Sequence, residues 1–179
     1  MSKDTAAGRG RLTLVLGGAR SGKSRYAQTL AMAMPPPWIY IATAEPRDDE
    51  MRTRIKAHQR MRGEGWLTTE TPIDLGGAVS EAPGSAPLLI DCLTLWLSNL
   101  MLGNHDIDAA IERLDDALQA RAAPIIAVSN EVGLGIVPET LLGRDFRDQA
   151  GSLNQHLAAK AHQVVLMVAG LPMIVKASP

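Results

Sequence analysis

A glycine-rich segment near the N-terminus has the residue types and the spacing of a phosphate-binding loop. It fits the pattern G-x-x-x-x-G-K-[ST] without a mismatch, and its residues are Gly17, Gly18, Ala19, Arg20, Ser21, Gly22, Lys23 and Ser24. In such a P-loop the glycines let backbone N–H groups turn toward a phosphate, the lysine reaches the β- and γ-phosphates, and the last hydroxyl binds Mg²⁺. A helix that starts there adds the positive end of its dipole. The segment therefore predicts a site for a nucleoside triphosphate, with Ser24 as a ligand of Mg²⁺.

In P-loop enzymes a carboxylate commonly helps the P-loop hydroxyl to hold Mg²⁺, and this carboxylate lies at the end of a hydrophobic strand. Asp91 has this setting, because it follows the apolar run Leu88-Leu89-Ile90. The alternative is an acidic residue that only caps the next helix. Beside the P-loop we favour the first interpretation, which makes Ser24 and Asp91 the predicted metal ligands.

His58 is the second residue that could carry chemistry. On a helix it would share one face with Arg54 and Arg62, which are each four residues away. Two flanking cations disfavour the protonated imidazole. A neutral imidazole can attack phosphorus while arginines hold the phosphate oxygens. On the residue types alone a solvated helix face is the favoured interpretation, because runs of charge on a helix usually face water.

The segment from Asn130 to Gly143 follows an apolar run and contains three glycines. Loops at the carboxyl ends of strands form the ligand sites of open α/β sheets, so Asn130 and Glu131 are candidate polar contacts. A purely structural loop is the alternative. We expect the arginines and aspartates between 144 and 148 to form ion pairs within a helix, and Cys92 to be a buried core thiol.

The elements that must position these residues alternate along the chain, which is typical of a parallel sheet covered by helices. Expected strands span 11–16, 38–42, 66–69, 87–91, 124–128, 163–168 and 173–176, and the last of them would form a hairpin edge. Expected helices span 24–34, Pro46 to about 62, 74–80, 93–102, 106–121 and 144–161.

Composition narrows the class of protein. A net charge of −1 and only six aromatic residues argue against a broad nucleic-acid surface. A single cysteine allows no internal disulfide, and no segment has the length or character of a membrane span or a signal peptide. We therefore expect a cytoplasmic enzyme, with a flexible tail at 1–10 and a single P-loop nucleotide-binding catalytic domain at 11–179.

From about residue 12 onward the sequence resembles the bifunctional adenosylcobinamide kinase / adenosylcobinamide-phosphate guanylyltransferase family of cobalamin synthesis. The P-loop is common to many families, whereas two other motifs are specific to this one. They are the loop Ser129-Asn130-Glu131-Val132-Gly133-Leu134-Gly135-Ile136-Val137-Pro138 and the segment Phe146-Arg147-Asp148-Gln149-Ala150-Gly151-Ser152-Leu153-Asn154-Gln155. The segments Tyr40–Ala44, Asp49–His58 and Asp91–Leu100 also match.

The resemblance implies two reactions. Adenosylcobinamide takes the γ-phosphoryl group of ATP or GTP, and adenosylcobinamide phosphate then takes GMP from GTP, with release of pyrophosphate. GMP passes through a covalent bond to a histidine, and His58 is the residue that matches it; Ala57 precedes it where some relatives have a second histidine. The resemblance also implies a RecA-like fold, a homotrimer, and nucleotide contacts at Ala42, Thr43, Ala44, Gln59, Arg60, Met61, Arg62, Glu70 and Asp91.

Three other functions stay open on the residues alone. A single-function small-molecule kinase would use Lys23 and Asp91 and would not need His58. A RecA-like motor that binds nucleic acid conflicts with the charge and the few aromatics. A regulatory module would bind GTP tightly without turnover.

Overall fold

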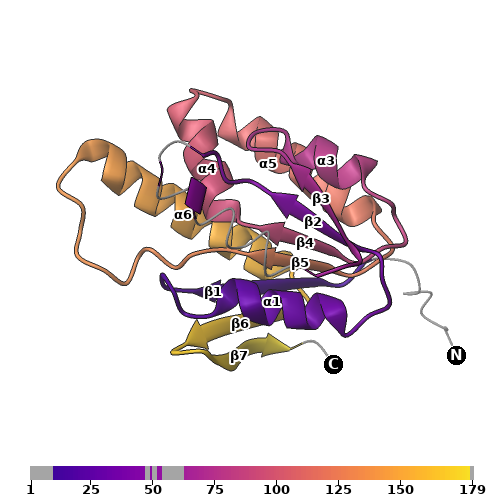
Figure 1. Ribbon diagram of the computed structural model, residues 1–179. Helices are drawn as coiled ribbons and strands as arrows, with labels where there is room; N and C mark the ends of the chain where they lie inside the picture. The colour runs from indigo at the N-terminus through magenta and orange to yellow at the C-terminus, as the bar shows by residue number, and fades with distance from the viewer. Residues whose placement is uncertain (1–9, 47–48, 50–51, 54–62, 178–179) are drawn as a thin grey trace, which may run out of the picture.

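The computed structural model describes residues 10–46, 49, 52–53 and 63–177, and its centre is a seven-stranded sheet with helices on both faces (Figure 1). The strands are β1 (Leu12–Gly17), β2 (Trp38–Ala42), β3 (Trp66–Glu70), β4 (Leu88–Asp91), β5 (Ile125–Val128), β6 (Gln163–Val168) and β7 (Leu171–Ala177). The helices described from end to end are α1 (Lys23–Met32), α3 (Leu75–Glu81), α4 (Leu93–Leu102), α5 (Ile107–Ala120) and α6 (Leu141–Lys160). Asp49, Arg52 and Thr53 are also helical, which agrees with the helix expected after Pro46 as far as it is described.

The strand order is β3-β2-β4-β5-β1-β6-β7, and every neighbouring pair is parallel except β6 and β7. This confirms the α/β class and the mostly parallel sheet. Parallel neighbours place their carboxyl ends at one edge of the sheet, so the loops after β1, β2, β4 and β5 meet there. The order also inserts β5 and β4 between β1 and β2, which the chain visits consecutively.

Alternating side chains divide the core into two clusters. On one face the strands pack against α3, α4, α5 and α6, around the fully buried Trp96, whose indole N–H donates to the carbonyl of Ile73 at 2.8 Å. On the other face they pack against α1 through Ala27 and Ala31. Figure 1 shows α1 lying across this second face. The helix that begins at the P-loop is therefore fixed directly on the sheet.

The C-terminal strand pair forms the expected hairpin at one edge of the sheet (Figure 1). Ala169 and Gly170 make its turn, both with positive φ angles, of 51° and 84°. Four apolar side chains of β7 are about half exposed or more: Leu171, Met173, Ile174 and Val175. Large exposed apolar surfaces commonly mark contacts with another molecule.

Helix α6 begins three residues before the predicted Arg144. Thr140 is its N-cap, and the Thr140 hydroxyl accepts a hydrogen bond from the N–H of Gly143 at 3.1 Å. Among the residues that the structure describes, Arg144 forms no ion pair with an aspartate. Its guanidinium donates to the carbonyls of Pro138 and Glu139 and so fixes the preceding loop. The expected ion pair is confirmed at Arg147 and Asp148, at 2.8 Å.

Among the described residues, no helix combines the length and the apolar character needed to cross a bilayer.

Candidate nucleotide-binding site

The P-loop has the expected context: β1 ends at Gly17 and α1 begins at Lys23. Gly17 has a φ of 149°, and a Cβ atom there would lie 2.7 Å from the carbonyl oxygen of Met167. Gly22 occupies the N-cap of α1 with a φ of 95°, which side chains strongly disfavour. The backbone of the loop thus depends on glycine at both ends, because one packs against β6 and the other is left-handed.

Lys23 lies inside this loop. Its ammonium donates to the carbonyl oxygen of Gly18 at 2.5 Å and lies 3.5 Å from the hydroxyl of Ser21, and the residue is only 7% exposed. Gly18, Ala19 and Arg20 are exposed around it. The positive charge is therefore held among the loop's polar groups, at the position where the motif places the phosphates of a nucleotide.

The β6–β7 hairpin supports the loop from the side. The N–H of Gly170 in the hairpin turn donates to the carbonyl oxygen of Ser21 at 3.0 Å. A Cβ atom at Gly22 would lie 3.4 Å from Cα of Gly170, so the two backbones are in contact. This contact ties the conformation of the P-loop to the edge hairpin, a link that the sequence alone did not indicate.

Asp91 ends β4 at the same edge of the sheet. Its carboxylate is half-buried, and one oxygen, Oδ2, accepts a hydrogen bond from the hydroxyl of Tyr40 at 2.8 Å. The N-cap of α4 is Cys92, so Asp91 is not that helix's cap, which removes the alternative considered for it. Ser24, also half-buried, lies in the first turn of α1. Mg²⁺ prefers one or two protein oxygens together with substrate phosphates, and this pair of oxygen donors fits that preference.

Thr43, a predicted nucleotide contact, is fully buried. Its hydroxyl donates to the carbonyl of Cys92 at 2.7 Å and accepts from the N–H of the same residue at 2.8 Å. Its own N–H donates to the carbonyl of Asp91, and its carbonyl accepts from the side chain of Asn99 at 2.8 Å. Every polar group of Thr43 thus binds within the protein, and the residue joins the end of β2 to the turn after β4.

The other predicted nucleotide contacts on β2 and β3 lie along the same edge. Ala42 and Ala44 are half-buried on either side of Thr43, and Glu70, at the end of β3, is exposed and pairs in register with Ala42. They form a rim beyond Asp91 in the strand order β3-β2-β4. His58, together with Gln59, Arg60, Met61 and Arg62, lies outside the described residues.

The loop after β5 is joined to the P-loop. The N–H of Glu131 donates to the carbonyl of Gly17 at 3.0 Å, and the N–H of Ser129 donates to that of Val15. On the other side, the buried hydroxyls of Thr94 and Ser129 are 3.2 Å apart.

Two buried polar residues of α4, Thr94 and Asn99, hold this edge together, and the sequence did not indicate their role. Thr94 contacts Ser129, 35 positions away, and Asn99 donates to the carbonyls of Thr43 and Pro72, which are 56 and 27 positions away. The partners of both residues lie far away in the sequence, so only the folded topology reveals these contacts.

Cys92 is buried, as predicted, and it is not a nucleophile of this site. Burial, and then the negative charge of Asp91, raise the pKa of its thiol to about 12. The thiol therefore stays neutral at physiological pH, whereas the thiolate is the reactive form.

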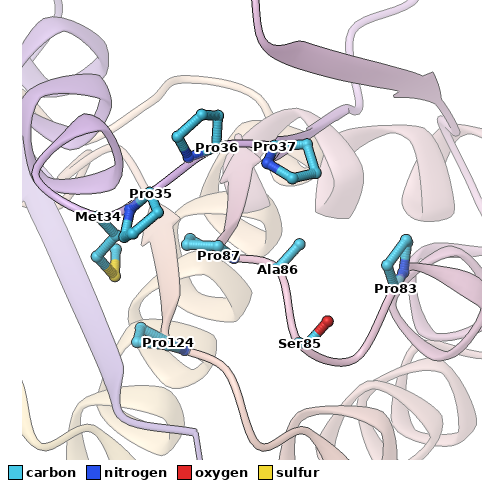
Figure 2. A pocket seen from close by; sticks show the side chains of 9 residues that line it. All are labelled: Met34, Pro35, Pro36, Pro37, Pro83, Ser85, Ala86, Pro87 and Pro124. Carbon is cyan, nitrogen blue, oxygen red and sulfur yellow. The ribbon is translucent and has the colours of Figure 1, made fainter.

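The apolar pocket in Figure 2 lies at the opposite edge of the sheet, among residues that precede the strands. Its volume is about 430 Å³, and it is lined by Met34, Pro35, Pro36, Pro37, Pro83, Ser85, Ala86, Pro87 and Pro124. None of these side chains is titratable. The residues predicted to bind the triphosphate and Mg²⁺, Lys23 and Asp91, lie instead at the carboxyl edge of the sheet.

The chain is a P-loop nucleotide-binding protein. Its glycine loop joins the buried strand β1 to α1, and Asp91 ends β4, which is separated from β1 by β5. Solved structures of this RecA-like class have the same fold. The flagellar accessory protein FlaH from Methanocaldococcus jannaschii matches with a TM-score of 0.56 at 15% identity, over 96% of this chain and 80% of that one. A solved ATPase domain matches with a TM-score of 0.56 at 13% identity, over 96% of this chain and 79% of that one. At these identities the likeness concerns the fold alone.

The chain belongs to the CobU family, described as cobinamide kinase / cobinamide phosphate guanyltransferase, which matches residues 13–175. The bifunctional adenosylcobalamin biosynthesis protein CobP of Pseudomonas aeruginosa is 46% identical, over 93% of this chain and 98% of the relative. The bifunctional adenosylcobalamin biosynthesis protein CobU of Salmonella typhimurium is 42% identical, over 92% and 99%. The resemblance seen in the motifs is thereby confirmed, and the chain is an enzyme of a family of kinases and nucleotidyltransferases.

Proposed function

We propose that this enzyme phosphorylates adenosylcobinamide with ATP or GTP. We further propose that it transfers GMP from GTP, through a GMP–histidine intermediate, to adenosylcobinamide phosphate, giving adenosylcobinamide-GDP and pyrophosphate. The observation that carries the proposal is the placement of the Lys23 ammonium within the glycine loop, at the sheet edge where Asp91 ends β4. Membership of the family supplies the class of substrate.

In the first reaction the chain's own work is positioning and neutralising charge, because phosphoryl transfer needs little covalent help from a protein. Lys23 and the loop amides hold the triphosphate. Ser24 and Asp91 supply the oxygens for Mg²⁺, which neutralises charge on the phosphates when bound. The neutral Cys92 thiol beside Asp91 adds no competing nucleophile.

In the second reaction the α-phosphorus is attacked. His58 Nε2 or Nδ1 forms a bond to it, and the bond to the bridging oxygen of pyrophosphate breaks; the phosphate of adenosylcobinamide phosphate then displaces the histidine. The covalent intermediate lets two large substrates use one site in turn. We assign nucleotide contacts to Ala42, Ala44, Glu70 and the segment 59–62. Thr43 belongs to this set on the resemblance, and its internal hydrogen bonds favour a supporting role.

We also propose that residues 11–179 act as one catalytic domain in the cytoplasm and that the enzyme is a homotrimer. Exposed apolar side chains on β7 and on the loop before α6, among them Ile136 at 98% and Leu134 at 85%, are consistent with burial between copies of the chain. Sedimentation of the purified protein tests the assembly: a monomer at micromolar concentration would contradict it.

Labelling with GTP that carries ³²P at the α-position tests the covalent step. The proposal expects label on the protein that is labile in acid and stable in alkali, and no label on His58→Asn. Phosphorylation of cobinamide without labelling would favour the single-function kinase. Tight GTP binding without either reaction would favour a regulatory module.

A further inference from the structure

Asn130 lies between the P-loop and Asp91, although no motif assigns it a role in the reaction. In the sheet, Val128 at the end of β5 pairs with Val15 of β1 on one side and with Asp91 of β4 on the other. The pairing with β1 continues past the strand, because the N–H groups of residues 129 and 131 donate to the carbonyls of Val15 and Gly17. Asn130 is thus part of an extended segment that lies between the P-loop and the end of β4, where Asp91 is the predicted metal ligand.

The alternation of the strand places the Asn130 side chain on the face of the sheet that carries α1. Ile126 and Val128 pack in the cluster formed with α1, and successive side chains of a strand point to opposite faces. Asn130 continues this series, as Asp91 continues from Leu89 of the same cluster. Ser129 points to the other face, where its hydroxyl meets that of Thr94.

Both backbone polar groups of Asn130 form hydrogen bonds with side chains, and the Asn130 side chain takes no part in these bonds. Its N–H donates to the hydroxyl of Thr94 at 2.6 Å, and its carbonyl accepts from the side chain of Asn154 at 3.2 Å. Within the part of the chain that the structure describes, the Asn130 carboxamide has no hydrogen-bond partner. The residue is half-buried, so a ligand can reach it. A fixed backbone with an available amide is a preorganised donor.

The chemistry of the position favours an amide. A carboxamide offers two N–H donors without adding charge, whereas a second carboxylate next to Asp91 would repel a triphosphate. Lys23 and the Mg²⁺ ligands can both reach the terminal phosphate only if it lies between them. A donor placed between Lys23 and Asp91 faces this region.

We propose that Asn130 is a further catalytic residue, whose side-chain N–H donates to a γ-phosphoryl oxygen during transfer. The inference rests on the proposed kinase function. In that step the acceptor hydroxyl oxygen bonds to the γ-phosphorus, and the bond to the β,γ-bridging oxygen breaks with its electron pair on the nucleoside diphosphate. The hydroxyl proton passes to water. Asn130 stabilises the charge on the oxygens of the transferring group.

The test compares Asn130→Ala with the wild type and with Gln119→Ala, which removes an amide from the exposed face of α5. We expect kcat for phosphorylation of cobinamide to fall by about 10- to 100-fold in Asn130→Ala, the size of effect expected when one hydrogen bond to a charged group is lost. Affinity for GMP-PNP should fall, while affinity for GDP should stay within about twofold, because GDP lacks the γ-phosphate. Gln119→Ala should match the wild type in all three.

Unchanged kcat, or equal losses of GDP affinity, GMP-PNP affinity and thermal stability, would overturn the proposal, since the second pattern marks a structural residue. If Asn130→Ala does not fold, Asn130→Asp has the same size and replaces a donor with a negative charge. It should lose GMP-PNP affinity and kcat at least as strongly, and wild-type values in it would refute the role. A wild-type protein without phosphoryl transfer would count against the proposed function, and the GMP-PNP comparison would still decide the role of Asn130.

Discussion

Thr43→Val distinguishes two roles of Thr43. The sequence predicts a nucleotide contact, whereas the structure shows hydrogen bonds between Thr43 and Cys92, which we call the clamp. Valine has nearly the shape of threonine and removes only the hydroxyl. In the wild type this hydroxyl makes two hydrogen bonds with the backbone of Cys92, at 2.7 and 2.8 Å, and the residue is fully buried. The substitution therefore leaves one buried N–H and one buried carbonyl without this partner.

The carbonyl of Cys92 also accepts from the N–H of Trp96 at 3.2 Å, so only the N–H of Cys92 is left unpaired. Leaving a buried polar group unpaired costs about 1–3 kcal/mol, and we expect Thr43→Val to lose about this much unfolding free energy. Urea unfolding followed by circular dichroism measures this loss. Thr43→Ser keeps the hydroxyl and removes a methyl group, which should cost about 1 kcal/mol. Thr29→Val changes the same residue type on the exposed side of α1 and should stay within about 0.5 kcal/mol of the wild type.

The clamp also limits what Thr43 can contact. Where Thr43→Val is folded, its affinity for GDP should change by less than about threefold, because no polar group of Thr43 is left to contact a ligand. A stable Thr43→Val protein with GDP binding weakened by about tenfold or more would refute the clamp and support direct contact.

Four further predictions concern the P-loop lysine, His58, a buried arginine and the cysteine. Lys23→Ala should impair phosphoryl and guanylyl transfer together, since both need a bound triphosphate, and normal turnover by this variant would contradict the role of Lys23. His58→Ala should abolish guanylylation in product assays and keep part of the kinase activity. Arg121→Met should lower the unfolding free energy by about 3–5 kcal/mol in urea titrations, because the buried guanidinium donates to four backbone carbonyls between residues 79 and 86, while the exposed Arg113→Met should change it by less than about 0.5 kcal/mol. The pKa of the Cys92 thiol is about 9 in the unfolded chain and is raised to about 12 in the folded protein. The unfolded chain therefore loses this proton first, and the free energy of unfolding should fall as pH rises from about 9 toward about 12. The wild type should lose more stability than Cys92→Ala over this range, and equal losses would argue against the raised pKa.

The local part of the site was predictable from the sequence. The P-loop motif and its flanking apolar runs predicted the strand, the turn and the helix, because each depends on residues within a few positions. The run before Asp91 likewise predicted β4 and the side of the sheet to which its carboxyl end belongs. The expected start of α6 is too late because Gly143 resembles a helix breaker, whereas Thr140 supplies the N-cap and binds the N–H of that glycine in the first turn.

The long-range part was not predictable. β5 lies between β1 and β4, and this order brings Asn130 between the P-loop and Asp91. The hydrophobic periodicity of a single strand does not indicate which strands become its neighbours. The same holds for the pairing of Thr43 with Cys92, 49 residues apart, and of Arg121 with the carbonyl of Val79, 42 residues apart. Such contacts depend on the whole topology, so the sequence indicated the residues' chemistry without their partners.

A crystal structure of the enzyme with Mg²⁺ and GMP-PNP would show whether the glycine loop binds the triphosphate. We expect the β- and γ-phosphates within the turn of residues 17–24, the Lys23 ammonium within hydrogen-bond distance of them, and the Asp91 carboxylate on the side of the metal. A nucleotide bound elsewhere, or a Lys23 side chain directed away from the phosphates, would contradict it.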